Sequence, residues 1–159
     1  MVDIKSLFEY NWYCNRKFLE CMAQLSWDKV TEDRGASFGS MRNVFTHMLD
    51  AEEGWVKALA SGKMEHRAGD EQERSFENID SIKKYMDEVE AKSRTYVMKL
   101  SPAQLDKQFE LRKNKFRIED LLMHIVEEEI HHRGELLCLM WQMDCEPPYK
   151  SYISYLLKQ

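Results

Sequence analysis

The feature that most limits how this chain can fold is its shortage of residues that interrupt helices. The 159 residues include only 3 prolines and 6 glycines, and two of the prolines adjoin at positions 147 and 148. Between these breaks, apolar residues recur at intervals of three and four, which is the period of an amphipathic helix. Helices of this kind bury their apolar faces by packing against one another. The sequence therefore predicts an all-α protein, most simply a helical bundle.

The periodic stretches give the expected helix boundaries. We expect four long helices over residues 4–25, 40–60, 79–100 and 118–143, and a short fifth helix from Pro148 to Leu157. Ser40 is a suitable N-cap for the second helix. Residues 61–76 are polar and indicate a loop, while residues 109–118 alternate between apolar and polar, which predicts a short hairpin or an extended loop. The length is that of one domain, residues 1–159.

Charge and hydropathy restrict the possible partners. No apolar run approaches the roughly 20 residues that span a bilayer, and the first residues lack the pattern of a signal peptide. We therefore expect a cytoplasmic protein with no membrane partner. The formal net charge is −5, and affinity for nucleic acid depends on Lys and Arg side chains that neutralise phosphates. The basic residues between 112 and 117 are flanked by acids and are more simply a solvated turn, so we expect no nucleic-acid partner.

Ionisable residues interrupt the apolar stripes of two predicted helices. In the last long helix, Glu128 and His132 occupy the middle of the stripe, and in the second helix His47 does the same. Burying such groups costs free energy unless they are paired or bind a metal. Glu128 and His132 are one helical turn apart, and a third ligand from a facing helix would complete a metal site. Spacing alone leaves two interpretations open, a metal site or a hydrogen-bonded core cluster.

A set of two histidines and one glutamate leaves coordination positions free for water or substrate, as catalytic metal sites do. The same set accepts Zn, Ni, Fe or Mn, so it does not fix the metal. The two tryptophans at stripe-like positions, Trp55 and Trp141, are most simply core residues.

Four groups of residues share their spacing with one known family. They are Tyr10-Asn11 with Asn15-Arg16, Ser40 with His47 and Trp55, the run HIVEEEIHHRGE at 124–135, and Pro147-Pro148-Tyr149 with residues 152–155. These segments resemble the DinB/YfiT family of metal-binding four-helix bundles, and the likeness covers nearly the whole chain. The most specific segment is residues 124–135, which is similar to the family's His-x-x-x-His-x-x-His-His-Arg-Gly-Gln. The resemblance implies a DinB/YfiT-like four-helix bundle with a short additional C-terminal helix.

The resemblance also implies a ligand set. The family's three histidines fall on His47, position 128 and His132, but position 128 is a glutamate here, and Glu135 stands where glutamine is usual. A carboxylate is still a competent ligand, so we expect His47, Glu128 and His132 to hold one divalent transition metal, most simply Zn or Ni, with Fe or Mn as alternatives.

The neighbours of this set have two interpretations each. His124 lies one turn before Glu128 and either supports that residue or replaces it as a ligand. His131 points away from His132 and is more simply a surface or packing residue. Asp50 either orients a ligand imidazole or is a plain exposed acid.

By resemblance, the metal would activate a small-molecule thiol for attack on a small electrophile, which makes the protein a thiol S-transferase in stress or detoxification. One alternative is a hydrolase that uses metal-bound water, with Glu127, Glu129 or His131 as general base. Another is a non-catalytic, stress-associated metal-binding bundle. The resemblance further implies a homodimer.

Overall fold

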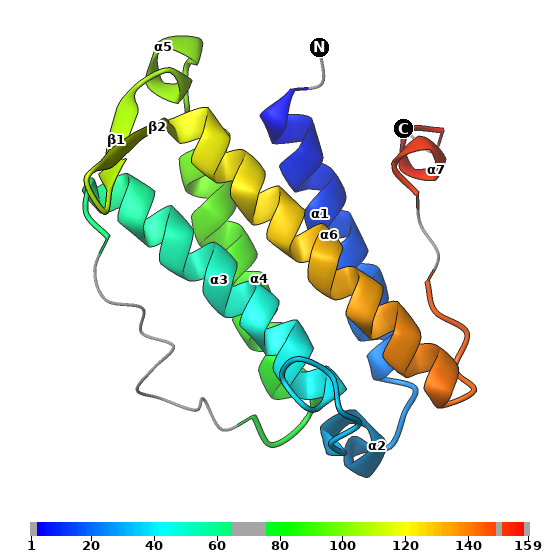
Figure 1. Ribbon diagram of the computed structural model, residues 1–159. Helices are drawn as coiled ribbons and strands as arrows, with labels where there is room; N and C mark the ends of the chain where they lie inside the picture. Colours follow the sequence, from blue (N-terminus) through cyan, green and yellow to red (C-terminus); the bar gives the residue numbers. More distant parts are fainter. Residues whose placement is uncertain (1–2, 65–75, 149–150, 158–159) are drawn as a thin grey trace.

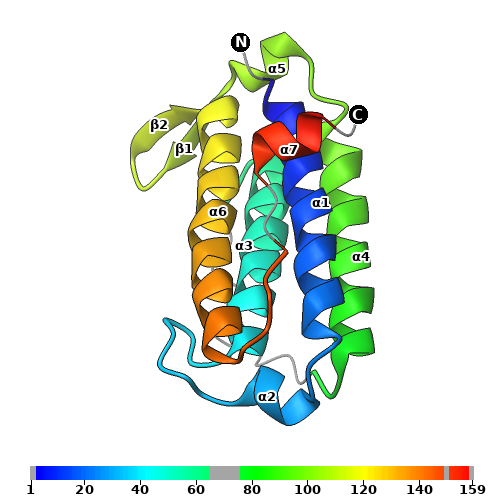
Figure 2. The ribbon, with the colours of Figure 1, turned by 90° about the vertical axis from the view of Figure 1, so that its right-hand side faces the viewer.

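Four long helices form the body of the molecule (Figures 1 and 2). The computed structural model describes residues 3–64, 76–148 and 151–157. The long helices are α1 (Ile4–Met22), α3 (Met41–Ser61), α4 (Ile79–Val97) and α6 (Ile118–Gln142). Helix α6 packs against α3 and α1, and α4 packs against the same two helices from the other side. The predicted all-α four-helix bundle is therefore confirmed.

Smaller elements connect and extend the bundle. The hairpin expected near residue 113 is present as β1 (Gln108–Leu111) and β2 (Asn114–Arg117), which pair antiparallel. Two short helices were not predicted, α2 (Trp27–Thr31) and α5 (Pro102–Leu105). The C-terminal helix α7 (Tyr152–Leu156) begins at Tyr152 and not at Pro148, because the Ser151 side chain caps its N-terminus by accepting from the Ser154 N–H. Residues 65–75 of the predicted loop and residues 149–150 lie outside the described part of the chain.

The ends of the long helices follow local chemistry. Ser40 is the N-cap of α3, as predicted, and its hydroxyl accepts a hydrogen bond from the Asn43 N–H at 3.2 Å. Helix α3 ends at Gly62, which has a φ of 74° that suits glycine. Helices α1 and α4 each end three residues earlier than expected, because residues 23–25 and 98–100 continue as turns and not as regular helix.

The core consists of two apolar clusters, one toward each end of the bundle. One cluster contains Phe18, Phe45 and Met140, and the other contains Phe8, Trp55 and Ile125. Trp55 is a core residue, as predicted, but Trp141 is 63% exposed on α6, so the expectation for Trp141 was wrong. Between the clusters lies a layer of buried polar side chains, composed of Asn11, Asn15, Glu52, Glu129, His132 and Arg133. No helix in the described ranges is both long and apolar enough to cross a membrane.

Candidate metal centre

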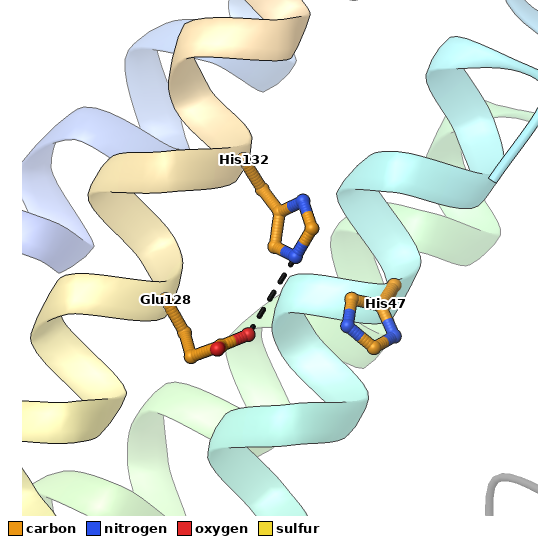
Figure 3. Close-up of side chains that lie close together, drawn as sticks. All are labelled: His47, Glu128 and His132. Atoms are coloured by element: carbon orange, nitrogen blue, oxygen red, sulfur yellow. Dashed lines mark ion pairs between the residues drawn. The ribbon is translucent and has the colours of Figure 1, made fainter. Parts of the chain in front are cut away.

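The three predicted ligands meet where α3 faces α6. Figure 3 shows His47 on α3, with Glu128 and His132 one turn apart on α6. Each of the three residues offers a nitrogen or oxygen atom that could bind a metal ion, and these three atoms all lie within 4.8 Å of one another. The structure thus brings together the residues that spacing and resemblance selected.

The His132 imidazole is held between two carboxylates. Its Nδ1 lies 2.7 Å from a carboxylate oxygen of Glu135, and its Nε2 lies 3.6 Å from Oε2 of Glu128. An ionised carboxylate only accepts hydrogen bonds, so Nδ1 carries the proton in a neutral imidazole. The lone pair of Nε2 then faces Glu128 and His47, which is the tautomer that a metal ligand needs.

Glu135 is fixed in turn by the loop before α3. It accepts hydrogen bonds from the Ser37 backbone N–H at 3.0 Å and from the Ser37 hydroxyl at 2.8 Å. Partial burial would raise the pKa of the Glu135 carboxyl, but the hydrogen bonds from His132 and Ser37 outweigh burial and lower this pKa below its usual value. Sequence reasoning missed this role, because Glu135 was noted only as a departure from the usual glutamine.

An aromatic side chain from the same loop covers His47. The Phe38 ring stacks on the His47 ring with centroids 3.8 Å apart and planes 22° apart, and it meets the His132 ring edge-on at 5.5 Å. Gly35 and Gly39 on either side have φ angles of 73° and 77°, which let the loop turn back toward the helices. The loop therefore packs against both imidazoles and limits how far they can rotate.

The position of Glu128 differs from the prediction in one respect. Its side chain is 33% exposed at the edge of the helix interface, whereas the acid that faces the core is the next residue, Glu129, which is 1% exposed. A helical face that buries more than 100° of arc includes adjacent positions, so a stripe drawn at steps of three and four cannot separate residues 128 and 129. Glu128 is at the rim of the core, where an ion bound to it would stay in contact with solvent.

Glu129 belongs to the buried polar layer. It accepts hydrogen bonds from Asn15 at 3.1 Å and from Arg133 at 3.2 Å, and Arg133 also donates to Asn11 at 2.9 Å. Burial, followed by the nearby Glu52 carboxylate, raises the pKa of Glu129 well above its usual value, although Arg133 and Asn15 oppose the shift. Glu129 is thus removed from solvent and from the metal cluster, which argues against the general-base role considered for it. The Arg133 four residues later is the sequence signal that marks this acid as paired.

The neighbouring residues considered in the sequence analysis have different surroundings. His131 is exposed, in line with the surface role expected for it. Asp50 accepts a hydrogen bond from the Tyr85 hydroxyl at 2.6 Å, so a partner on α4 fixes it. His124 packs edge-on against Trp55 at 5.3 Å and groups with Glu127 and Glu128, not with His47 and His132.

The donor geometry fits a transition metal. Two ligand atoms of a tetrahedral ion with bonds of about 2.0–2.1 Å lie about 3.3 Å apart. The 3.6 Å between His132 Nε2 and Glu128 Oε2 is close to that value. The His47 donor atom lies within 4.8 Å of the other two, so a small shift of the His47 ring, within the limit set by Phe38, would bring it into range. Two imidazoles and one carboxylate are a known ligand set for Zn²⁺ that leaves a position open.

Comparison with known proteins places the chain in a family. The model of the DinB family matches residues 1–158. An uncharacterized protein of Bacillus subtilis, YizA, is 22% identical over 152 residues, which is 95% of this chain and 94% of that protein. The crystal structure of a DinB-like protein of Bacillus subtilis, YjoA, superposes with a TM-score of 0.71 at 19% identity, covering 90% of this chain and 96% of that one. The match to the family model over nearly the full length shows that the chain belongs to the DinB family.

Proposed function

We propose that His47, Glu128 and His132 hold one divalent transition metal, preferably Zn or Ni, and that the protein uses this metal as a thiol S-transferase. The observation that carries the proposal is the convergence of the three donor atoms, with Nδ1 of His132 2.7 Å from Glu135 and its Nε2 turned toward Glu128. Fe and Mn are the alternatives, because two imidazoles and one carboxylate also bind these metals.

The chemistry assigned to the site is transfer of a small thiol to a small electrophile. A divalent ion in this position lowers the pKa of a thiol, which makes the thiolate available at neutral pH. The sulfur forms a bond to the electrophilic carbon, the leaving group departs with its electron pair, and the thiol proton goes to solvent. The protein's part is to orient the imidazoles through Glu135 and Phe38 and to leave the rim at Glu128 open to reactants.

The test combines metal analysis with a conjugation assay. Protein stripped with chelator and reloaded with Zn²⁺ or Ni²⁺ is incubated with glutathione, bacillithiol or mycothiol and a bimane electrophile, and conjugates are counted by mass spectrometry. We expect turnover that requires the metal, that is lost in His132→Ala and that survives in Glu88→Gln, a change at an exposed residue of α4. Metal-dependent ester hydrolysis without consumption of thiol would favour the hydrolase instead. Bound metal with neither activity would favour a non-catalytic metal-binding protein.

A further inference from the structure

Glu128 belongs to two groups of potential ligands at once. Besides the cluster with His47 and His132, it forms a second group with His124 and Glu127, whose donor atoms also lie within 4.8 Å of one another. His124 Nδ1 is 3.8 Å from Oε2 of Glu127. Because His124, Glu128 and His132 follow one another at steps of four, they form a row along one face of α6. Glu128 is in the middle of that row.

A carboxylate in this position has one oxygen for each neighbour. An imidazole offers a single lone pair in its neutral form, whereas a carboxylate has two oxygens and can bridge two ions. The glutamate at position 128 thus permits an arrangement that a histidine there would not.

The charges around the second group favour a cation. Glu127 and Glu128 are adjacent, and the ion pairs that the structure gives them within residues 3–64, 76–148 and 151–157 are with histidines alone. Neighbouring carboxylates whose described partners are histidines repel each other, and a cation bound to Glu127 beside Glu128 would relieve that repulsion. The His124 ring is meanwhile held in place by the buried Trp55.

We infer that His124, Glu127 and Glu128 form a second divalent-cation site that shares Glu128 with the first. This inference rests on the proposed metal site at His47, Glu128 and His132. With two carboxylates and one imidazole, the second site suits a harder ion such as Mn²⁺ better than the first does. Its side chains are more exposed, with Glu127 62% exposed, so we expect it to bind its ion more weakly than the first site.

The two sites are tested with two metals. Stripped protein is first titrated with Zn²⁺ against a chromophoric chelator, which measures the first site alone. Protein carrying one equivalent of Zn²⁺ is then titrated with Mn²⁺, and free Mn²⁺ is followed by its electron paramagnetic resonance signal. We expect one Mn²⁺ per Zn²⁺-loaded chain. His124→Ala and Glu127→Gln should each weaken Mn²⁺ binding at least tenfold and change Zn²⁺ affinity less than threefold.

Two further variants distinguish this site from others. Glu128→His should abolish Mn²⁺ binding while it keeps or tightens Zn²⁺ binding, because it removes the bridge. Glu88→Gln is the control for the carboxylate change, since Glu88 is an exposed acid on α4, and it should leave Mn²⁺ binding unchanged. Mn²⁺ binding that is absent up to millimolar concentration, or that survives both His124→Ala and Glu127→Gln, would overturn the inference. Failure of Zn²⁺ to bind would instead refute the proposed function.

Discussion

Glu135 offers the sharpest test of how the protein holds its metal ligands. In Glu135→Ala, the His132 imidazole loses the acceptor that lies 2.7 Å from its Nδ1. The ring can then rotate, and the proton can move to Nε2, the atom that faces Glu128. Loss of a carboxylate that orients a ligand histidine typically lowers metal affinity 10- to 100-fold. That range corresponds to about 1.4–2.8 kcal/mol.

The structure also predicts a graded series. Glu135→Gln keeps an oxygen that can accept from His132 Nδ1 but loses the charge, so its Zn²⁺ affinity should fall less than tenfold. Ser37→Ala removes one of the two hydrogen bonds that fix Glu135 and leaves the backbone N–H bond intact, so the loss should be smaller still. If Ser37→Ala instead displaced the whole loop before α3, its loss of Zn²⁺ affinity would exceed that of Glu135→Gln.

Zn²⁺ affinity is measured by competition with a chromophoric chelator at pH 7.5, on protein whose helix content and melting temperature are checked by circular dichroism. Glu135 is a partly exposed residue, so we expect the alanine variant to fold. If Glu135→Ala binds Zn²⁺ within twofold of the unmodified chain while it remains folded, the carboxylate does not orient His132, and the tautomer argument is wrong.

The remaining predictions concern the ligands, the pH dependence, the buried acid and the oligomeric state, the last of which rests on the family resemblance. His132→Ala should abolish metal binding measured by elemental analysis. Glu128→His should tighten binding of Ni²⁺ and Zn²⁺, and if this variant leaves the affinity for every metal unchanged, Glu128 is not a ligand. Protons compete with metals for imidazole nitrogen, whose reference pKa is about 6.5. Metal occupancy and melting temperature should therefore fall together below about pH 6 and recover with added metal. A melting temperature that does not change with added metal from pH 5 to 8 would favour a hydrogen-bonded core cluster. Burial raises the pKa of Glu129, so the folded state loses stability as pH rises from about 4.5. The melting temperature of stripped Glu129→Gln should therefore fall less than that of the stripped unmodified chain as pH is raised from 4.5 to 7, and parallel curves would contradict this. Light scattering should give twice the chain mass of 19.0 kDa. Ile130 lies on an exposed apolar face of α6 with Met123 and Trp141, so Ile130→Asp should halve the measured mass. A mass near that of one chain for the unmodified protein at micromolar concentration would count against the dimer.

The long helices were predictable because each has enough turns for its apolar period to appear in the sequence. The short helices α2 and α5 have five and four residues, too few to show a period in the sequence. The start of α7 was missed for a similar reason, since Pro148 is the stronger breaker but Ser151 supplies the cap.

The candidate site was predictable where its signal is local. His47 and His132 appear as polar residues in apolar stripes, and the resemblance aligned position 128 with them. The difference between Glu128 and Glu129 was not predictable from spacing, because both positions border the same face of α6. The support from Ser37 was also out of reach, since 98 residues separate it from Glu135 and no local pattern joins them.

The buried polar layer has a consequence for the order of folding and metal loading. Trp12 donates to Glu52 at 2.8 Å, and Arg133 joins Glu129 to Asn11. Sliding α6 by one turn, or rotating it by one residue, would move these groups into apolar surroundings and leave them without partners, at a cost of several kcal/mol.

The hydrogen bonds of this layer therefore fix the axial position and the rotation of α6 relative to α1 and α3. Those two settings are also what make Glu128 and His132 face His47. The positions of the ligand residues are consequently set when the protein folds, so metal binding requires only side-chain adjustments. Metal exchange should thus proceed on the timescale of side-chain and loop motion, without waiting for the helices to separate.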